Sequence, residues 1–395
     1  MKCTRVDSLE AESNVMPLKF RRELLGLNYL SGVFMFRDHP ISRELSDYHE
    51  FDFYNIRPHP LPFYGRMLKL LGDSKESFLN MGKMLERCKF LLPDCSFNLS
   101  LAGYSKKVTS DLVYNRLFTG IESGCSDFRK VYTDGSVVDF RCGSGVLIDG
   151  VGYSYRLPDY FNIFTAELFA IKKALELAIQ RGAGKFVFYV DSLSVLQALK
   201  HVKIHHYLIA SIVNLINTMR GFTILFVWIP SHRNISDNVR VDELAREGTL
   251  LLNIHDVQES LVERKANIRR DCMVKWQDEW DGARGFYRNI KNHIGDWPSA
   301  YRRDRREEIV LCRMRLNVCR FAYQHFFEGT DQLSCMHCRT PITLEHLVLY
   351  CPVFHDFRSR LSNVDVLQMS SYLTDEYNHS SLFRFLKSVN YFDKI

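Results

Sequence analysis

Residues 129–252 alternate between strand-like and helix-like patterns, and this alternation limits the possible fold more than any other feature of the chain. The short apolar run 186–190 is typical of a central strand that is buried on both faces. The other strand-like runs are 128–138, 143–149, 151–157 and 222–229. The helix-like runs are 165–181, 192–201, 207–219 and 237–250. We expect Asp149 and Gly150 to form a hairpin turn, and Thr165 to be the N-cap of its helix. One meander followed by βα units predicts an α/β domain, with a mixed five-stranded sheet flanked by helices.

Four carboxylates lie in or beside the elements predicted for this region. Asp134 follows the apolar residues of the first strand, and Glu167 falls in the first turn of a helix with a small apolar face. Asp191 comes directly after the run 186–190, and Asp242 lies on the last helix. Carboxylates are rarely buried unless they are paired or bind a metal ion. Divalent cations would relieve their mutual repulsion, and a pair of cations would make a centre that cleaves phosphodiesters.

Each of these carboxylates has an ordinary interpretation when it is taken alone. An aspartate at a strand end forms turns, a glutamate near a helix N-terminus favours the helix dipole, and Asp242 alone reads as a surface charge. His232, however, lies in a loop ten residues before Asp242. The four carboxylates together with this histidine therefore predict one catalytic site.

The motifs that contain these residues occur in one order. They are Thr133-Asp134-Gly135-Ser136, Ala166-Glu167-Leu168, Asp191-Ser192, Pro230-Ser231-His232, and Asn238 to Asp242 followed by Glu243-Leu244-Ala245. Over residues 129–252 the chain resembles a type 1 ribonuclease H domain, and His232, Asn238 and Asp242 keep the family spacing. The chain departs from the family at Ser231 and Asp237, where glycine is usual, and at Val239, where glutamate is usual. These departures bear on the mobility of the histidine loop and remove no metal ligand.

The resemblance implies a two-metal mechanism with Mg²⁺ ions about 4 Å apart, for which Mn²⁺ can substitute. Asp134 would bridge the ions, Glu167 and Asp191 would hold the ion that activates water, and Asp242 would complete the other. His232 would be a mobile accessory group. The expected substrate is an RNA/DNA hybrid, whose RNA strand is cut to leave 5′-phosphate and 3′-hydroxyl ends. The weak candidates for contacting the 2′-hydroxyl groups are Gly135, Ser136 and Asn162.

Two other functions remain open at this stage. The first is a catalytically silent, nucleic-acid-binding protein that keeps the fold and the zinc-type region, and Mg²⁺ binding would distinguish it from the nuclease. The second is a DNA-processing nuclease of the integrase type, which shares the carboxylate fold. The contexts VYTDGS and AEL, with the His–Asn–Asp spacing, favour ribonuclease H over an integrase.

A cluster of soft ligands follows in the C-terminal part. Its members are Cys335, Cys338, His346 and Cys351. This spacing predicts a closed tetrahedral Zn²⁺ site with a structural role. His337 and His355 are alternative ligands, and unpaired cysteines in a small helical core are the alternative to a metal site. The 11 cysteines are otherwise scattered, which favours reduced thiols over a disulfide framework.

The order of motifs after residue 252 resembles the C-terminus of a LINE-type, non-LTR retrotransposon polyprotein of the Jockey-like kind. The motifs are Trp276-Gln277 with Trp280, Arg313-Met314-Arg315-Leu316, the four cluster residues, and Cys351-Pro352-Val353-Phe354 with Arg358. Asn317-Val318 replace the usual Gly-His. Residues 17–36 look like the connection that follows the reverse transcriptase of such a polyprotein. Because no YxDD-type aspartate pair occurs in the sequence, we expect the polymerase and endonuclease portions to be absent.

The flanking regions and the composition give weaker indications. Residues 1–128 predict a helical appendage or linker, and residues 253–395 predict a mostly helical, zinc-knuckle-like region. The net charge of +6 is compatible with nucleic acid as a partner but does not by itself predict it. No apolar run reaches the roughly 20 residues that span a bilayer, and the charged N-terminus is unlike a signal peptide. We therefore expect an intracellular protein, nuclear or cytoplasmic, with no membrane association and no evident protein partner.

Overall fold

The computed structural model describes residues 4–36, 39–47, 63–72, 78, 81–83, 93–105, 108–202, 206–231, 233, 235–297, 302–358, 361 and 369–395. The chain folds as two units, which are residues 25–269, and residues 1–24 together with 270–395. The domain boundaries expected after residues 128 and 252 stay predictions. Among the described residues, no helix combines the length and the apolar character that crossing a membrane requires.

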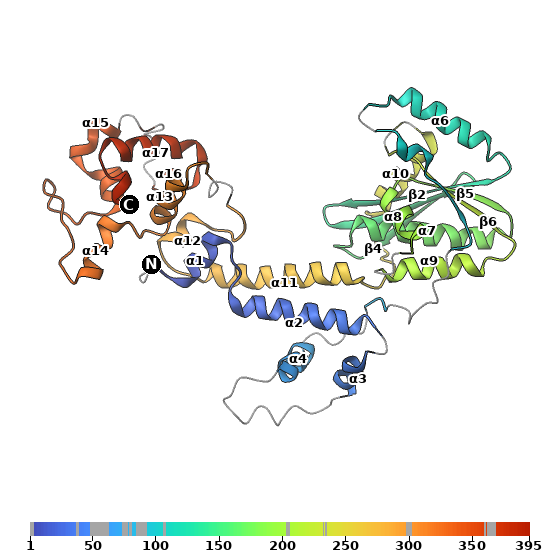
Figure 1. The fold of residues 1–395 in the computed structure, drawn as a ribbon, viewed down its shortest axis with the longest axis horizontal. Coiled ribbons are helices and arrows are strands. Elements are labelled where there is room, and N and C mark those ends of the chain that lie inside the picture. The colour runs from blue at the N-terminus through green and yellow to red at the C-terminus, as the bar shows by residue number, and fades with distance from the viewer. Residues whose placement is uncertain are drawn as a thin grey trace. The chain divides into compact units, whose positions relative to one another are not determined.

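The unit of residues 25–269 is built on a six-stranded sheet with the order β1-β6-β5-β2-β3-β4 (Figure 1). The strands are β1 (Ser96–Asn98), β2 (Arg129–Val138), β3 (Arg141–Ile148), β4 (Val151–Leu157), β5 (Lys185–Val190) and β6 (Thr223–Trp228). The four neighbours β1, β6, β5 and β2 run parallel to one another. The strand β3 pairs antiparallel with β2, and β4 pairs antiparallel with β3. The predicted mixed sheet is therefore confirmed. The strand β1 is an addition that the sequence did not predict, because three residues show no recognisable period.

Helices cover both faces of this sheet. The helices that lie wholly within the unit are α3 (Pro40–Asp47), α4 (Phe63–Gly72), α6 (Asp111–Ser123), α7 (Ile163–Gln180), α8 (Leu193–Lys200), α9 (Tyr207–Thr218) and α10 (Ser236–Gly248). The short helix η2 (Ser100–Gly103) follows β1. The helices α2 (Leu18–Phe34) and α11 (Leu261–Asp281) each contain residues of both units. The expected N-cap Thr165 is wrong, because the N-cap of α7 is Asn162, whose side chain accepts from the amide of Thr165.

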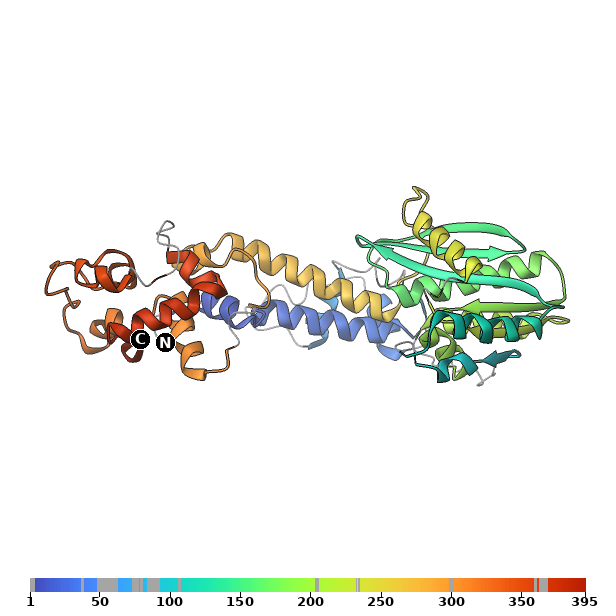
Figure 2. The same cartoon turned by 90° about the horizontal axis from the view of Figure 1, so that it is seen from above.

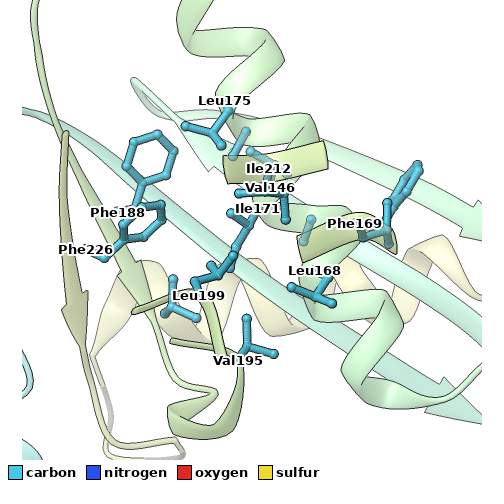
Figure 3. Packing of buried hydrophobic residues seen from close by; sticks show 14 of the residues in the cluster. Val146, Leu168, Phe169, Ile171, Leu175, Phe188, Val195, Leu199, Ile212 and Phe226 are labelled. Carbon is cyan, nitrogen blue, oxygen red and sulfur yellow. The ribbon is translucent and has the colours of Figure 1, made fainter. Parts of the chain in front are cut away.

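The main core of this unit lies between the sheet and the helices α7, α8 and α9. The predicted apolar face of α7 is buried there, and Ile171 and Leu175 face the aromatic side chains of the central parallel strands (Figure 3). Phe188 of β5 and Phe226 of β6 are fully buried, with ring centroids 5.1 Å apart. The all-apolar run of β5 is thus a buried central strand, as its composition predicted.

The helix α10 covers the opposite face of the sheet, across β2, β3 and β4 (Figure 2). It approaches closely because two glycines of β3 carry no side chain. A Cβ on Gly143 would lie 2.3 Å from the carbonyl oxygen of Ala245, and one on Gly145 would lie 2.5 Å from that of Val241. These two glycines set the distance of α10 from the sheet and thereby the position of Asp242.

The other unit is helical, and its core contains apolar side chains from both ends of the chain. Its helices and short helical turns are α1 (Val6–Ser13), α12 (Phe286–Ile290), α13 (Arg305–Arg315), α14 (Arg320–Glu328), η4 (His346–Tyr350), η5 (Pro352–Phe354), α15 (His355–Arg358), α16 (Met369–Thr374), α17 (Glu376–Ser388) and η6 (Phe392–Lys394). Trp280 lies in this core, Trp297 packs against it, and Trp276 is also buried, so these tryptophans are structural. Arg315 is fully buried, with its guanidinium over the ring of Trp297 and 3.5 Å from a carboxylate oxygen of Glu12.

Candidate active site

The pairing of β2 with β5 brings two of the predicted carboxylates together. The pairing of these strands ends with Thr133 opposite Val190, and the next residues are Asp134 and Asp191. Because paired strands stay in register, the two carboxylates lie side by side at the carboxyl end of β5, which is where ligands bind in open α/β sheets. The strand β2 continues to Val138 without β5 beside it, which leaves one side of β2 open next to Asp134.

Glu167 reaches the same place from helix α7. A Cβ on Gly135 would lie 2.8 Å from the Cβ of Ala166 and 2.9 Å from the amide nitrogen of Glu167, so only glycine allows this approach. The hydroxyl of Ser144 on β3 also donates to the carbonyl oxygen of Ala166 over 2.7 Å. The sheet thus holds the first turn of α7 directly against β2.

Asp134, Glu167 and Asp191 form a compact carboxylate cluster. One oxygen from each residue lies within 4.8 Å of the others. Asp134 and Glu167 are buried, and Asp191 is partly buried. The amide of Gly135 donates to Oδ1 of Asp134 over 2.9 Å, while Oε2 of Glu167 is buried with no hydrogen-bond partner within the described residues.

The surroundings of the cluster disfavour the ionised form of its carboxylic acids. Burial raises the pKa of Asp134 to about 8, and the carboxylates of Asp191 and Asp242 add to this shift. Burial also raises the pKa of Glu167, with Asp134 and Asp191 as the next causes. Buried like charges are a strong signal of a functional site, because they persist only where something offsets them.

Asp242 lies on α10, close enough for its charge to raise the pKa of Asp134, but outside the group of carboxylate oxygens within 4.8 Å. Its Oδ2 is 2.9 Å from Nη2 of Arg246, one helical turn further along α10. The structure therefore brings three of the four predicted carboxylates into one cluster and places the fourth beside it in an ion pair.

His232, the fifth predicted residue, lies outside the described residues. Its neighbour Arg233 pairs with Asp111 of α6 over 2.5 Å and lies over the ring of Tyr114. The departure at Asp237 places a carboxylate in the first turn of α10, where it suits the helix dipole. Burial and then this carboxylate raise the pKa of Tyr132.

The residues suggested for contacting the substrate have different surroundings. Gly135 and Ser136 lie on β2 directly after Asp134, and Ser136 is buried. Asn162 is engaged as the N-cap of α7. Asn238, in the first turn of α10, has a buried Oδ1 with no hydrogen-bond partner within the described residues.

The donor set of the cluster fits divalent cations. Carboxylate oxygens are the ligands that Mg²⁺ and Mn²⁺ prefer, and three of them lie within the reach of one ion. A bound cation would contact Oε2 of Glu167, which has no hydrogen-bond partner among the described residues, and would favour the ionised form of Asp134, whose pKa burial raises. The residues therefore suit a cation-dependent hydrolytic centre.

The chain was compared with known proteins, and residues 128–250 match a family model described as RNase H. This segment is an RNase H domain. Its matched range includes all four carboxylates and the whole sheet except β1. The family match therefore supports assigning this segment to the ribonuclease H class of hydrolases. No curated protein matches the chain.

Solved structures resemble about a third of the chain. RNase H1 from the halophilic archaeon Halobacterium salinarum NRC-1 is 20% identical, covers 30% of this chain and 96% of its own, and has a TM-score of 0.25. LC11-RNase H1 in complex with an RNA/DNA hybrid is 23% identical, covers 31% of this chain and 96% of its own, and has a TM-score of 0.26. The prototype foamy virus protease-reverse transcriptase is 20% identical, with 33% and 22% of the two chains covered and a TM-score of 0.27.

A second candidate site lies in the other unit. The structure gathers four ligand atoms within 4.8 Å, from Cys335, Cys338, His346 and Cys351. The sulfur of Cys351 lies 3.9 Å from that of Cys335 and 4.0 Å from that of Cys338. The alternative ligands His337 and His355 are exposed and do not belong to this group.

Local backbone structure shapes this second cluster. Residues 333–342 form a narrow hairpin, in which the amide of Cys335 donates to Thr340 over 2.8 Å. The amide of Cys338 lowers the pKa of the Cys335 thiol to about 6, with His346 and the amide of His337 as further causes. Nδ1 of His346 lies 3.3 Å from Oγ1 of Thr340, and its Nε2 is buried without a hydrogen-bond partner in the part of the chain that the structure describes.

The sequence interpretation missed one buried acidic residue near the active site. Glu263 is 1% exposed, and its carboxylate contacts Ser260 and the first turn of α7. The signal was present, because Ser260 and Glu263 have the S-x-x-E spacing of a helix capping box.

Proposed function

We propose that the RNase H domain hydrolyses the RNA strand of RNA/DNA hybrids by endonucleolytic cleavage, leaving 5′-phosphate and 3′-hydroxyl ends. The observation that carries this proposal is the cluster of Asp134, Glu167 and Asp191 beside β2, at the carboxyl end of β5. The family match over residues 128–250 supports it, as does the presence of Asp242 on the adjacent helix.

Three elements of the chain would hold the three carboxylates in position. Asp134 is held by the amide of Gly135, Glu167 by the packed first turn of α7, and Asp191 by the end of β5. Each side chain therefore presents oxygen ligands from a rigid element, which favours a preorganised site. Divalent cations bound there, Mg²⁺ with Mn²⁺ as a substitute, would supply the positive charge that phosphodiester hydrolysis requires.

Cleavage of a labelled RNA/DNA hybrid in Mg²⁺ tests the proposal. The unchanged chain should cut the RNA strand. Asp134→Asn should reduce the rate by more than about 100-fold, which is the upper end of the effect of changing an outer-shell group. Asp139→Asn is the matched control, because Asp139 lies in the turn after β2 at a positive φ of 48° that asparagine also tolerates. Equal rates in the three proteins would contradict the proposal.

A silent binding protein is the second candidate function. The ion pair between Asp242 and Arg246 favours it, because it leaves one expected ligand engaged elsewhere. Binding of the hybrid without cleavage in either Mg²⁺ or Mn²⁺ would support this second function and exclude the first.

We also propose that Cys335, Cys338, His346 and Cys351 hold a structural Zn²⁺ ion. The closed set of ligand atoms and the unpartnered Nε2 of His346 support this. Metal analysis of the purified chain should find one equivalent of zinc, which Cys338→Ser should lose and Cys95→Ser should retain. Zinc content that is unchanged in Cys338→Ser would contradict the assignment.

We propose, finally, that the chain has a type 1 ribonuclease H domain and is related to LINE-type, Jockey-like retrotransposon polyproteins. The order of the motifs after residue 252 supports this relation. The genomic sequence upstream of the coding region tests it. A reverse transcriptase gene or its remnant in the same orientation is expected there, and unrelated upstream genes at every genomic copy would contradict the proposal.

A further inference from the structure

Glu263 is a buried carboxylate that joins two helices. Its Oε2 accepts from the amide of Ser260 over 2.9 Å and from the hydroxyl of the same serine, which caps α11. Its Oε1 accepts from the hydroxyl of Thr165 and, over 3.4 Å, from the amide of Asn162. One side chain thus caps its own helix and also binds the N-terminus of α7.

His206 extends this set of hydrogen bonds to a third helix. Its Nδ1 accepts from the amide of Leu208 over 3.3 Å, so that nitrogen carries no proton. Its Nε2 lies 3.0 Å from Oγ1 of Thr165 and is therefore the donor. The bonds run in one direction, from His206 to Thr165 to Glu263, and end on the carboxylate, which only accepts.

The three side chains are shielded from solvent. The exposed fractions are 0% for Thr165, 5% for His206 and 1% for Glu263. None of them can touch a nucleic acid bound outside the domain. Any effect of these residues on the reaction must therefore act through the helix to which they bind.

That helix carries a residue of the candidate active site. Thr165 and Glu167 lie two residues apart in α7, and Asn162 is its N-cap. The sheet holds the same turn from the other side, through Ser144 and the close approach at Gly135. The position of the Glu167 backbone is therefore fixed between β2 and Glu263.

The segment that supplies Glu263 packs closely on the domain, although it follows the end of the family match at residue 250. The amide of His255 donates to Arg156 of β4 over 2.8 Å, and Val257 belongs to the main core. The hydroxyl of Tyr207 donates to the carbonyl oxygen of Gln258 over 2.8 Å. Glu263 is therefore brought to α7 by a chain segment with its own anchoring contacts.

We propose that Glu263, acting with Thr165 and His206, is a positioning residue that holds Glu167 at the metal-binding geometry. This inference rests on the proposed function, because it assigns a cation ligand role to Glu167. A carboxylate is required at residue 263 because its oxygens face four donors: two from Ser260, one from Thr165 and one from Asn162. An amide at this position would turn its NH₂ group toward some of these donors.

Two substitutions test the proposal with little change in volume. Glu263→Gln removes the charge, and Thr165→Val removes only the hydroxyl that joins the helices. Each should weaken Mn²⁺ binding, measured by titration calorimetry on the full chain, and lower kcat by about 10-fold, the lower end for outer-shell groups. KM for the hybrid should not change, because the residues do not reach the substrate.

Three further variants distinguish positioning from general stability. Thr165→Ser keeps the hydroxyl and should retain both Mn²⁺ affinity and kcat. Glu259→Gln is the matched control, because Glu259 lies in the same segment but binds Asn267 and Arg264 and not α7. The double variant Glu263→Gln with Thr165→Val should be no worse than the more impaired of the two single variants, because both changes act on the same set of hydrogen bonds.

The outcomes separate this inference from the proposed function. If the unchanged chain cuts the hybrid while Thr165→Val keeps its Mn²⁺ affinity and kcat, the positioning role is wrong and the nuclease stands. If the chain binds Mn²⁺ without cutting, and both variants bind Mn²⁺ more weakly, the positioning role stands and the nuclease is wrong. If the unchanged chain neither cuts nor binds Mn²⁺, both are wrong. Should Glu263→Gln fail to fold, Thr165→Val and Thr165→Ser decide the question.

Discussion

Arg246 holds Asp242 in an ion pair of 2.9 Å along helix α10, beside the carboxylate cluster of the RNase H domain. The Arg246 side chain is 59% exposed, and such surface pairs contribute up to about 1 kcal/mol. Arg246 therefore competes with a cation for Asp242. The competition is weak enough for a bound cation to overcome it.

Removal of this competitor should strengthen cation binding. Arg246→Met should lower the Mg²⁺ concentration for half-maximal cleavage by at most about fivefold, which corresponds to about 1 kcal/mol. The control is Arg240→Met, because Arg240 pairs with Glu243 and Glu247 on the same helix and loses the same charge. If the two variants shift the Mg²⁺ dependence equally, the change in net charge explains it and the pair with Asp242 does not.

The close approach of α10 to β3 predicts a strong effect of a single methyl group. In Gly145→Ala the new Cβ would lie 2.5 Å from the carbonyl oxygen of Val241 and 2.7 Å from the amide of Ala245. We expect a loss of about 1–3 kcal/mol in stability, measured by thermal unfolding. Because Asp242 would move, the Mg²⁺ concentration for half-maximal cleavage should also rise. Gly184→Ala should change neither property, since its nearest neighbour would be a ring atom of Phe186 at 3.8 Å. Equal melting temperatures for the two variants would disprove the packing argument.

A buried histidine makes the stability of the helical unit depend on pH. Burial lowers the pKa of His379 to about 4, and the guanidinium of Arg315 and, less strongly, that of Arg302 add to this, whereas the carbonyl oxygen of Leu373 and the carboxylate of Asp375 oppose it. Above pH about 6.5, the usual value, the histidine is neutral whether folded or unfolded, and stability does not depend on it. Between pH 6.5 and 4 only the unfolded chain takes up the proton, so the free energy of unfolding falls.

The total loss from His379 should approach about 3 kcal/mol at pH 4. Urea unfolding followed by tryptophan fluorescence measures it, because Trp276, Trp280 and Trp297 lie in this unit. His379→Gln should be less stable at pH 7.5 but should lose less stability between pH 7.5 and 5. A variant with the same pH dependence as the unchanged chain would exclude this histidine as the cause.

Loss of the buried Arg315 should strongly destabilise the same unit, and a second substitution should restore much of the lost stability. Arg315→Met leaves the carboxylate of Glu12 without its guanidinium, and breaking a buried pair costs about 3–5 kcal/mol. Adding Glu12→Gln should restore much of the melting temperature, because the unpaired charge is then gone. The comparison is Arg313→Met, because among the described residues the guanidinium of Arg313 donates to the carbonyl oxygen of Ile395 and its loss should matter much less. A double variant as unstable as Arg315→Met would show that packing on Trp297 dominates.

Local sequence patterns were sufficient for most of the sheet and for the order of the site residues. The run 186–190 and the turn at Asp149 and Gly150, where φ is 52° and 78°, depend on residues that are adjacent in the sequence. The strand β1 was missed because its only support is pairing with β6, far along the chain. Thr165 and Asn162 are both good N-cap residues. In the structure Asn162 caps the helix by accepting from the amide of Thr165, and the hydroxyl of Thr165 donates to Glu263 instead.

The sequence predicted which carboxylates come together but not the ion pair that one of them forms. The motifs around Asp134, Glu167 and Asp191 indicated a common cluster, and the register of β2 and β5 explains why they meet. The ion pair of Asp242 could not be foreseen from a helix that also offers Arg240 as a partner. The burial of Arg315 was also invisible in the sequence, because an arginine-rich stretch equally suits a surface that binds nucleic acid.

The anchoring of residues 254–263 on the sheet and on α9 bears on how this domain can be moved between proteins. A fragment that stops at residue 250 would uncover the core beside Val257 and leave the hydroxyl of Thr165 without its acceptor. The smallest transferable piece is therefore longer than the segment that defines the family. A chimera that joins the domain to another protein should keep the chain at least as far as Glu263.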